Sequence, residues 1–201
     1  KNFYGIESNI HNLSKAVSPN MAIAYATLRK IGNSIGNVNR ALKAFKGNPN
    51  KLEMVGSYGK VMFVNDSSTT IPDAVPFTIN KLGNVKKHLI IGGTNVKLDP
   101  TPLVEAAISC SSVHLLDGSF TKEVLIPALD KANISYTGPY ASMDLVVSSA
   151  FGKCNINNKT PEAVLLCPGA AALNYPGREY GRGEVFTTAV EKFLKLIQES
   201  E

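Results

Sequence analysis

The segment at residues 65–74 reads NDSSTTIPDA and combines the Asp66 carboxylate with four consecutive hydroxyl side chains at residues 67–70. A short apolar strand is expected before it and a helix after it. The free N–H groups at a helix N-terminus attract negative charge, so this loop could bind an anion such as a carboxylate. Asp, Ser and Thr also cap helices, because their oxygens accept hydrogen bonds from the same N–H groups. Composition alone favours capping and leaves a ligand site as the alternative.

Two glycines, Gly92 and Gly93, open a second polar loop, which reads GTNVKL at residues 93–98. This loop superficially resembles a phosphate-binding loop. However, Val96 stands where a glycine must let backbone N–H groups approach phosphate, and Leu98 lacks the hydroxyl that would bind Mg²⁺. The two glycines therefore predict a tight turn after a strand rather than a phosphate site.

A third loop, at residues 167–174, consists mainly of small residues that could let a ligand lie close to the backbone. Cys167 begins this loop, but no histidine lies within four residues to activate its thiol as a nucleophile. A buried structural thiol is therefore the favoured interpretation of Cys167.

The residues with metal-binding or catalytic chemistry are otherwise dispersed. The cysteines are odd in number and widely spaced, which predicts neither a disulfide framework nor a metal cluster and suits a reducing compartment. The histidines are equally scattered, and we expect them to be packed or solvated rather than metal ligands. These residues are Cys110, Cys154, Cys167, His11, His88 and His114. The sequence offers no catalytic triad.

The elements that must position the three loops are strands alternating with helices beyond residue 50. This alternation predicts βαβ units, and hence an α/β, Rossmann-like fold with a mainly parallel sheet and helices on both faces. Ligands of such sheets bind beyond the carboxyl ends of the strands, where the three loops should meet. We expect strands at residues 61–64, 88–91, 113–116, 134–137 and 163–166, and helices at residues 73–82, 102–109, 122–132, 141–150 and 184–198.

The N-terminal part has a different pattern, in which an irregular segment is followed by predicted helices at residues 18–31 and 35–45. The run GNPN at residues 47–50 then provides adjacent turn-forming residues. We therefore predict a domain boundary here. It separates a helical tail of one domain, residues 1–46, from a complete Rossmann-like domain, residues 47–201.

Composition limits the classes of function. The chain has 201 residues, with 21 Lys and Arg against 16 Asp and Glu, and a net charge of +5. Its basic residues are scattered, so a solvated surface is favoured over a nucleic-acid site. No apolar run approaches the roughly 18 residues that a membrane span needs. The chain begins at Lys1 without a signal peptide, and we expect it to be part of a longer protein.

Taken in order, these segments resemble the C-terminal part of the Mur ligase family, and within it the ligases that add D-glutamate. Residues 65–74 are similar to the family's Asn-Asp-Ser/Thr signature, and LIIGGT at residues 89–94 to its strand and glycine turn. LLCPGAAAL at residues 165–173 resembles the loop after the family's last strand, and RGEVF at residues 182–186 matches its Arg-Gly-x-x-Phe motif.

The resemblance implies part of an ATP-dependent ligase of peptidoglycan precursor synthesis in the cytoplasm. Family members use ATP and Mg²⁺ to activate a carboxylate of a UDP-muramoyl peptide precursor as an acyl phosphate, which the amine of D-glutamate attacks. The C-terminal domain positions this amino acid and closes over the nucleotide. By the same resemblance, residues 1–46 belong to the central ATP-binding domain, which holds most of the ATP and Mg²⁺, and the protein is a monomer acting on small molecules.

Residue by residue, the resemblance assigns nucleotide contacts to Asn20, Lys51 and Asp66. It assigns substrate contacts to Ser67, Ser68, Thr70, Ala172, Leu173 and Tyr180. It supplies no metal ligand and no complete catalytic set within the chain. Lys51 replaces a family arginine, Ser68 a lysine and Ala172 a serine. A non-catalytic Mur-fold domain that binds ligands or regulates is therefore the alternative, and a Rossmann-like domain with an unrelated ligand is a third interpretation.

Overall fold

The structure is a computed structural model that describes residues 19–45 and 47–199, with the side chains of Pro19 and Asn20 outside the described part. The chain divides into two compact units, residues 1–47 and 48–201. No helix within the described residues is both long and apolar enough to cross a membrane.

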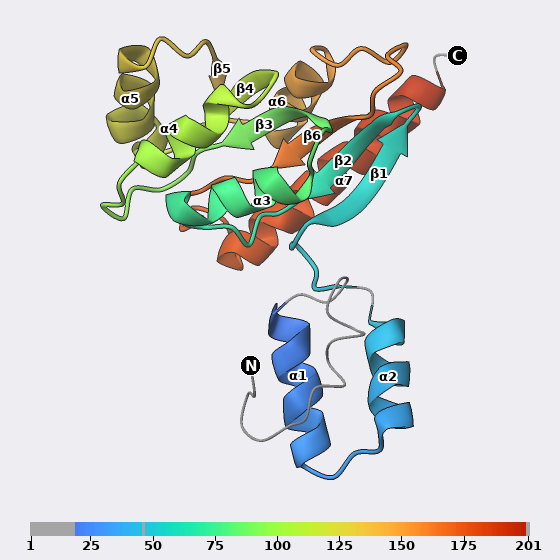
Figure 1. Cartoon of the computed structure of the whole chain (residues 1–201). Helices are drawn as coiled ribbons and strands as arrows, with labels where there is room; N and C mark the ends of the chain where they lie inside the picture. Colours follow the sequence, from blue (N-terminus) through green and yellow to red (C-terminus); the bar gives the residue numbers. More distant parts are fainter. Residues whose placement is uncertain (1–18, 46, 200–201) are drawn as a thin grey trace. The chain divides into compact units, whose positions relative to one another are not determined.

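The described part of the first unit forms two helices, α1 (Pro19–Lys30) and α2 (Ile35–Ala44) (Figure 1). Both agree with the helices predicted from the sequence. Ser34 caps α2, because its Oγ accepts a hydrogen bond of 3.2 Å from the N–H of Asn37. Tyr25 and Val38 are the buried apolar side chains in the described part of this unit.

The second unit is built on a six-stranded sheet in the order β1-β2-β6-β3-β4-β5. β1 pairs with β2 in antiparallel fashion, and every other pair of neighbouring strands is parallel. The strands are β1 (Glu53–Tyr58), β2 (Val61–Asn65), β3 (Lys86–Ile91), β4 (Ser112–Leu116), β5 (Thr137–Tyr140) and β6 (Glu162–Leu166). The predicted α/β fold with a mainly parallel sheet is confirmed.

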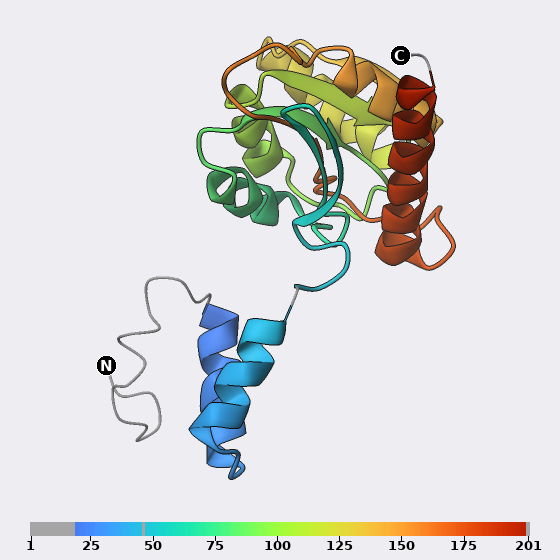
Figure 2. The same cartoon turned by 90° about the vertical axis from the view of Figure 1, so that its right-hand side faces the viewer.

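Helices cover both faces of this sheet, as Figure 2 shows for α7 on one side and α3 on the other. The central strand β6 packs both faces: Leu165 belongs to one buried apolar cluster, and Leu166 to the other. This double burial explains the continuous apolar runs of the strands. The helices are α3 (Val75–Lys81), α4 (Thr101–Ile108), α5 (Ile126–Lys131), α6 (Met143–Phe151) and α7 (Arg178–Gln198).

Several elements differ from the prediction. β1 was not expected, because this edge strand contains Gly56 and none of its residues is fully buried, which leaves little apolar signal. β5 covers residues 137–140 and not 134–137. The helix predicted at residues 122–132 begins with a π-helical turn, η3 (Thr121–Leu125), before α5.

The last helix, α7, starts six residues before the predicted residue 184. Its first turns contain Gly181 and Gly183, which disfavour a helix by propensity. Both positions are too crowded for a side chain: a Cβ would lie 1.7 Å from the carbonyl oxygen of Pro176 at Gly181, and 1.8 Å from Asn50 Oδ1 at Gly183. Close tertiary packing therefore outweighs local propensity at this helix start.

Candidate functional site

The three predicted loops meet at the carboxyl edge of the parallel sheet. They follow β2, β6 and β3, which are neighbours in the sheet. Backbone hydrogen bonds join them: Gly169 N–H to Thr69 O at 3.0 Å, Gly92 N–H to Pro168 O at 3.0 Å, and Thr94 N–H to Ala171 O at 2.8 Å. The loops thus form one continuous rim, as expected for a doubly wound sheet.

The two glycines after β3 adopt left-handed backbone conformations but do not close the predicted tight turn, because their N–H groups bond to Pro168 O and Thr121 Oγ1 in other segments. Gly92 and Gly93 have φ values of +115° and +154°. A Cβ would lie 2.3 Å from Thr121 Oγ1 at Gly92, and 2.5 Å from the carbonyl oxygen of Ala171 at Gly93. Only glycine allows this backbone and so close an approach of the loop after β6.

Asp66 is fully buried beneath this rim. Its Oδ1 accepts a hydrogen bond of 3.0 Å from the N–H of Leu52. Its Oδ2 accepts hydrogen bonds from the hydroxyls of Thr69, at 2.6 Å, and Thr78, at 2.5 Å. The Cys167 thiol also points to Oδ2, with 3.5 Å between sulfur and oxygen. Both carboxylate oxygens are therefore occupied within the protein.

The favoured capping interpretation of the first loop is wrong. The helical turn η2 (Pro72–Ala74) and the following α3 receive no hydrogen bond from a capping side chain. Pro72 and Pro76 lie in their first turns and lack the N–H group that a cap would bind. Asp66 instead fastens the loop to α3 and to the segment before β1.

Lys51 is the cation nearest to Asp66. Its ammonium lies 3.5 Å from Asp66 Oδ1 and donates a hydrogen bond of 3.0 Å to Thr69 Oγ1. The Lys51 side chain is 47% exposed, whereas the Asp66 side chain is fully buried. The ammonium is thus held by the protein, while nearly half of the Lys51 side chain is exposed beside the loop after β2.

Arg182 also belongs to this site, although the sequence analysis assigned it no role. It is fully buried in α7, and its guanidinium donates three hydrogen bonds. They run from Nε to Ser67 Oγ at 2.9 Å, from Nη2 to Ser67 O at 2.8 Å, and from Nη1 to Ala170 O at 3.0 Å. Arg182 therefore joins the loop after β2, the loop after β6 and α7.

The charge of Arg182 has no carboxylate partner within 4.0 Å among the described residues. Burial lowers the pKa of its guanidinium to about 10, although Tyr175 and Glu179 oppose this shift. The guanidinium remains protonated at neutral pH and adds positive potential to the rim. The sequence motif RGEVF includes Arg182. The burial of Arg182 depends on loops that lie outside this motif, so the motif alone does not predict it.

The other residues predicted to contact the nucleotide or the substrate differ in burial and in hydrogen bonding. Ser67 is buried, and its hydroxyl donates to the carbonyl oxygen of Glu179 at 2.7 Å. Ser68 and Thr70 are half-buried, and Ser68 Oγ has no hydrogen-bond partner in the described part of the chain. Ala172 is buried, whereas Leu173 and Tyr180 are more than half exposed. Asn20 lies in the other unit, with its side chain outside the described residues.

Cys167 is a buried thiol, as predicted. Burial and the negative charge of Asp66 raise its pKa well above the ordinary value. A thiol of this kind stays protonated at neutral pH and is a poor nucleophile.

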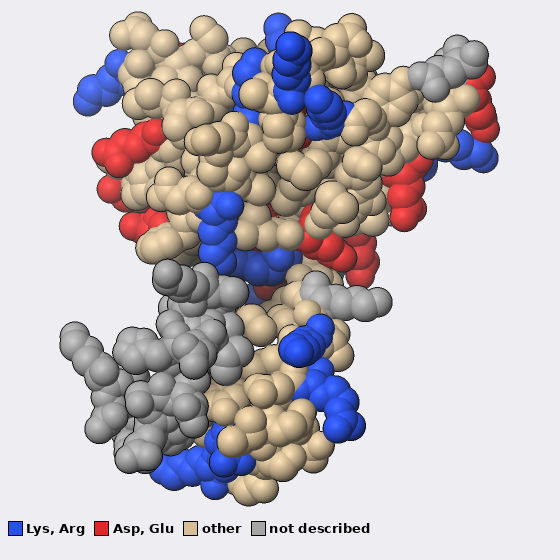
Figure 3. Space-filling view, turned by 45° about the vertical axis from the view of Figure 1, so that its right-hand side comes forward, with Lys and Arg blue, Asp and Glu red and all other residues tan. Residues whose placement is uncertain are grey.

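The basic residues are spread over the face of the molecule that Figure 3 shows. On the face shown in Figure 3, Lys and Arg side chains lie in several separate groups, with Asp and Glu between some of them. This distribution agrees with the scattered lysines of the sequence.

The chain is similar to curated ligases of one kind. It is 30% identical over 151 residues to the UDP-N-acetylmuramoylalanine–D-glutamate ligase of Treponema pallidum, a match covering 75% of this chain and 27% of that ligase. The ligase of the same name from Roseiflexus sp. is 30% identical over 191 residues, which cover 91% of this chain and 38% of the relative. No model of a known protein family matches the chain.

Solved structures of Mur ligases share the fold. The UDP-N-acetylmuramate–alanine ligase MurC of Thermotoga maritima aligns with a TM-score of 0.60 at 14% identity, covering 97% of this chain and 39% of that one. A murein peptide ligase of Psychrobacter arcticus aligns with a TM-score of 0.53 at 20% identity, covering 92% and 38%.

The predicted family resemblance is confirmed: this chain is a divergent homologue of the C-terminal part of the Mur ligases. It spans roughly a third of the length of the curated relatives that it matches.

Proposed function

We propose that this chain is the C-terminal part of an ATP-dependent ligase that joins an amino acid, D-glutamate or a close analogue, to a UDP-muramoyl peptide precursor. The observation that carries this proposal is the continuous rim of three loops at the carboxyl edge of the sheet, with Lys51 exposed beside it. Curated relatives with the name of such a ligase match most of the chain and support the substrate class.

The residues present fit a bound nucleotide through Lys51 rather than through Asp66. ATP and Mg²⁺, when bound, would supply the phosphoryl group that activates a carboxylate for attack by an amine. Lys51 offers an ammonium to the phosphates, although it cannot form the two parallel hydrogen bonds of an arginine. Asp66 has both oxygens engaged, and its task is to hold Lys51 in place.

The substrate amino acid would lie against the rim formed by the loops after β2 and β6. Ser68 and Thr70 provide hydroxyl donors there, and Ser68 Oγ lacks a hydrogen-bond partner in the described structure. An unsatisfied buried hydroxyl is unfavourable and is relieved by a ligand atom or a water molecule. The buried Arg182 adds positive potential beside the same loops, which favours a substrate that carries carboxylates.

The remaining assignments follow from the same proposal. Asn20 contacts the nucleotide from residues 1–46, which form the end of the ATP-binding domain. The protein works as a monomer in the cytoplasm on small molecules, and it takes part in peptidoglycan precursor synthesis. Closure of this domain over the substrates would bring the amine to the activated carboxylate and exclude water.

The test uses the full-length protein that contains this chain. It is incubated with ATP, Mg²⁺ and UDP-N-acetylmuramoylalanine, together with D-glutamate, D-aspartate or L-lysine, and the products are identified by mass spectrometry. The proposal predicts a product with an acidic D-amino acid and equimolar ADP. The 201-residue chain alone should release no phosphate, because it lacks a complete phosphate-binding loop. A folded full-length protein that ligates none of these amino acids would support the non-catalytic alternative.

A further inference from the structure

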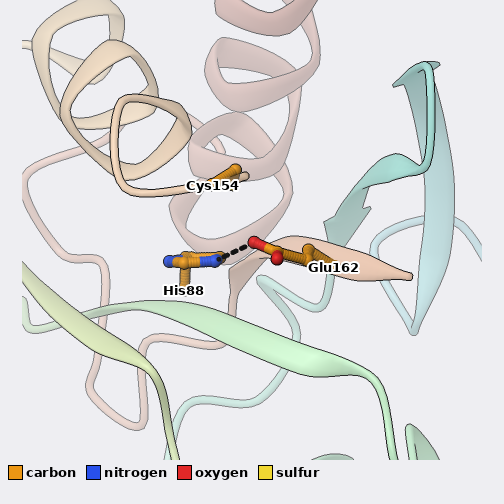
Figure 4. A group of neighbouring side chains, drawn as sticks. All are labelled: His88, Cys154 and Glu162. Carbon is orange, nitrogen blue, oxygen red and sulfur yellow. Dashed lines mark hydrogen bonds and ion pairs between the residues drawn. The ribbon is translucent and has the colours of Figure 1, made fainter. Parts of the chain in front are cut away.

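A second polar cluster lies at the opposite, amino edge of the sheet. β3 and β6 are parallel neighbours, and their first residues, Lys86 and Glu162, are directly paired. His88 follows two residues later in β3, and Cys154 lies in the turn after α6. Figure 4 shows the His88 and Glu162 side chains joined by a hydrogen bond, with Cys154 beside them.

The donor atoms of these three side chains converge. His88 Nε2 lies 2.9 Å from Glu162 Oε2. One ligand atom from each of His88, Cys154 and Glu162 lies within 4.8 Å of the others. His88 and Glu162 are buried and Cys154 is half-buried, so solvent competes little with an ion bound among them.

We propose that His88, Cys154 and Glu162 form a binding site for a zinc-like divalent cation, with water as the fourth ligand. Imidazole nitrogen, thiolate sulfur and carboxylate oxygen are the protein ligands that Zn²⁺ uses. Bonds of about 2.0–2.3 Å to a tetrahedral ion place the donor atoms roughly 3.3–3.6 Å apart. The His88–Glu162 pair must therefore widen slightly and the Cys154 sulfur must move inward, which its position in a turn permits.

The surrounding hydrogen bonds suit metal ligation by His88. Its Nδ1 lies 2.8 Å from Ser112 Oγ, which in turn lies 2.7 Å from His114 Nε2. With Nε2 bound to the cation, Nδ1–H donates to Ser112 and the Ser112 hydroxyl donates to His114. A partner on the second ring nitrogen is the usual support for a metal-binding histidine.

The carboxylate of Glu162 is held in place in a similar way. Its Oε1 accepts a hydrogen bond of 2.8 Å from Asn158 Nδ2, and its Oε2 accepts one of 3.0 Å from the N–H of Asn155. The half-exposed Lys86 side chain lies beside this carboxylate at the amino edge, with its ammonium 3.8 Å from Glu162 Oε1. The carboxylate is thus oriented toward His88 before any ion binds.

Charge and protons balance when the cation binds. The S–H bond of Cys154 breaks, its proton goes to solvent, and a metal–sulfur bond forms. In the metal-free site the Nε2–H of His88 donates to Glu162 Oε2. That N–H bond breaks when Nε2 binds the cation, its proton goes to solvent, and the ring is left with a single proton, on Nδ1. One thiolate and one carboxylate then neutralise the two positive charges of the ion, so the bound site carries no net charge.

This site is separate from the proposed ligand rim. His88 and Glu162 lie near the amino ends of their strands, whereas the rim follows the carboxyl ends. The cation would join β3, β6 and the turn after α6, and its role is structural. It is distinct from the Mg²⁺ that accompanies ATP in the proposed ligase.

The test titrates the 201-residue chain with Co²⁺ and then Zn²⁺, and compares Cys154→Ser with Cys110→Ser. Cys110 is a matched control, because both thiols are half-buried and each lies 3.5 Å from the carbonyl oxygen four residues earlier. The wild type and Cys110→Ser should bind one Co²⁺ per chain, with a thiolate-to-metal charge-transfer band that Zn²⁺ abolishes. Cys154→Ser should lose this band and bind Zn²⁺ at least about tenfold more weakly.

A measurement on the wild type alone covers the case in which Cys154→Ser fails to fold. Alkylation of each cysteine is followed by mass spectrometry with and without one equivalent of Zn²⁺. Zn²⁺ should slow the alkylation of Cys154 at least about tenfold and leave that of Cys110 unchanged. Equal rates with and without Zn²⁺, or a charge-transfer band that persists in folded Cys154→Ser, would overturn the proposal.

Discussion

The carboxyl and amino edges of the same parallel sheet use polar groups in different ways. At the carboxyl edge, loops are joined by backbone hydrogen bonds and fastened from below by Asp66 and Arg182, while Lys51 remains exposed. At the amino edge, side chains such as His88 and Glu162 bond directly to one another in a buried network. The first arrangement leaves the Lys51 side chain open to solvent, and the second encloses its polar side chains in the interior.

This difference indicates which side chains of a divergent domain can be substituted without loss of the fold. Exposed groups at the carboxyl edge, such as Lys51 and Tyr180, can be replaced individually with little effect on stability. Buried groups at either edge are bonded to several elements at once. Replacing one of these leaves its partners unsatisfied, at a cost of about 1–3 kcal/mol for each buried group.

Arg182→Met should have the largest effect on the carboxyl edge. It removes three hydrogen bonds and leaves two carbonyl oxygens and the Ser67 hydroxyl with fewer partners. We expect the free energy of unfolding of the second unit to fall by about 3–5 kcal/mol in urea denaturation. Lys195→Met, on the exposed side of the same helix, should change it by no more than about 0.5 kcal/mol. Equal stability of the two variants would show that Arg182 does not fasten the loops.

Asp66→Ala should come next. The substitution removes the hydrogen-bond acceptor of the Leu52 N–H and of the Thr69 and Thr78 hydroxyls. We therefore expect the free energy of unfolding to fall by about 2–4 kcal/mol. Asp73→Ala is the control, because Asp73 is exposed in the same segment. If the unfolding free energies of Asp66→Ala and Asp73→Ala differed by less than about 0.5 kcal/mol, Asp66 would not be fixed by these hydrogen bonds and could contact a ligand directly.

The protein should lose stability in acid because of His114, which is hydrogen-bonded through Ser112 to the cluster at the amino edge. Burial lowers the pKa of His114 from 6.5 to about 4, and the charges of His88 and Lys153 contribute. Between these values the unfolded chain binds more protons than the folded chain, so stability falls as the pH decreases from 6.5 to 4. We expect a loss of about 2 kcal/mol over this range in urea denaturation. His114→Gln should flatten this part of the profile, and an unchanged slope would assign it to other groups.

The carboxyl edge was predictable from the sequence because each of its loops directly follows a strand with a strong apolar pattern. Strand ends of a parallel sheet meet at one edge, so Asp66, Gly92 and Gly169 could be brought together before the structure was known. Which of their side chains face solvent could not be predicted. The burial of Asp66 depends on Thr78 in α3 and on Leu52, whose contacts with it are not encoded in neighbouring residues.

The polar cluster at the amino edge was not predicted from the sequence, because it too depends on contacts between residues that are distant in the chain. His88, Cys154 and Glu162 are far apart in the sequence, and their spacing matches no metal-binding motif. Only the pairing of β3 with β6 and the turn after α6 bring them together. Similarly, Gly181 and Gly183 suggested a later start for α7, because propensity does not record how closely Pro176 and Asn50 pack against them.

The most direct test of the central claim, that the carboxyl edge serves a ligase, compares Lys51→Met with Lys60→Met in the full-length protein. Lys60 is an exposed lysine in the turn before β2, at the opposite end of that strand from the rim. The measurement is kcat/KM for ATP in the ligation of D-glutamate. We expect Lys51→Met to lower it at least about tenfold, or roughly 1.4 kcal/mol, and Lys60→Met to leave it unchanged. Equal values for the two variants would contradict the claim.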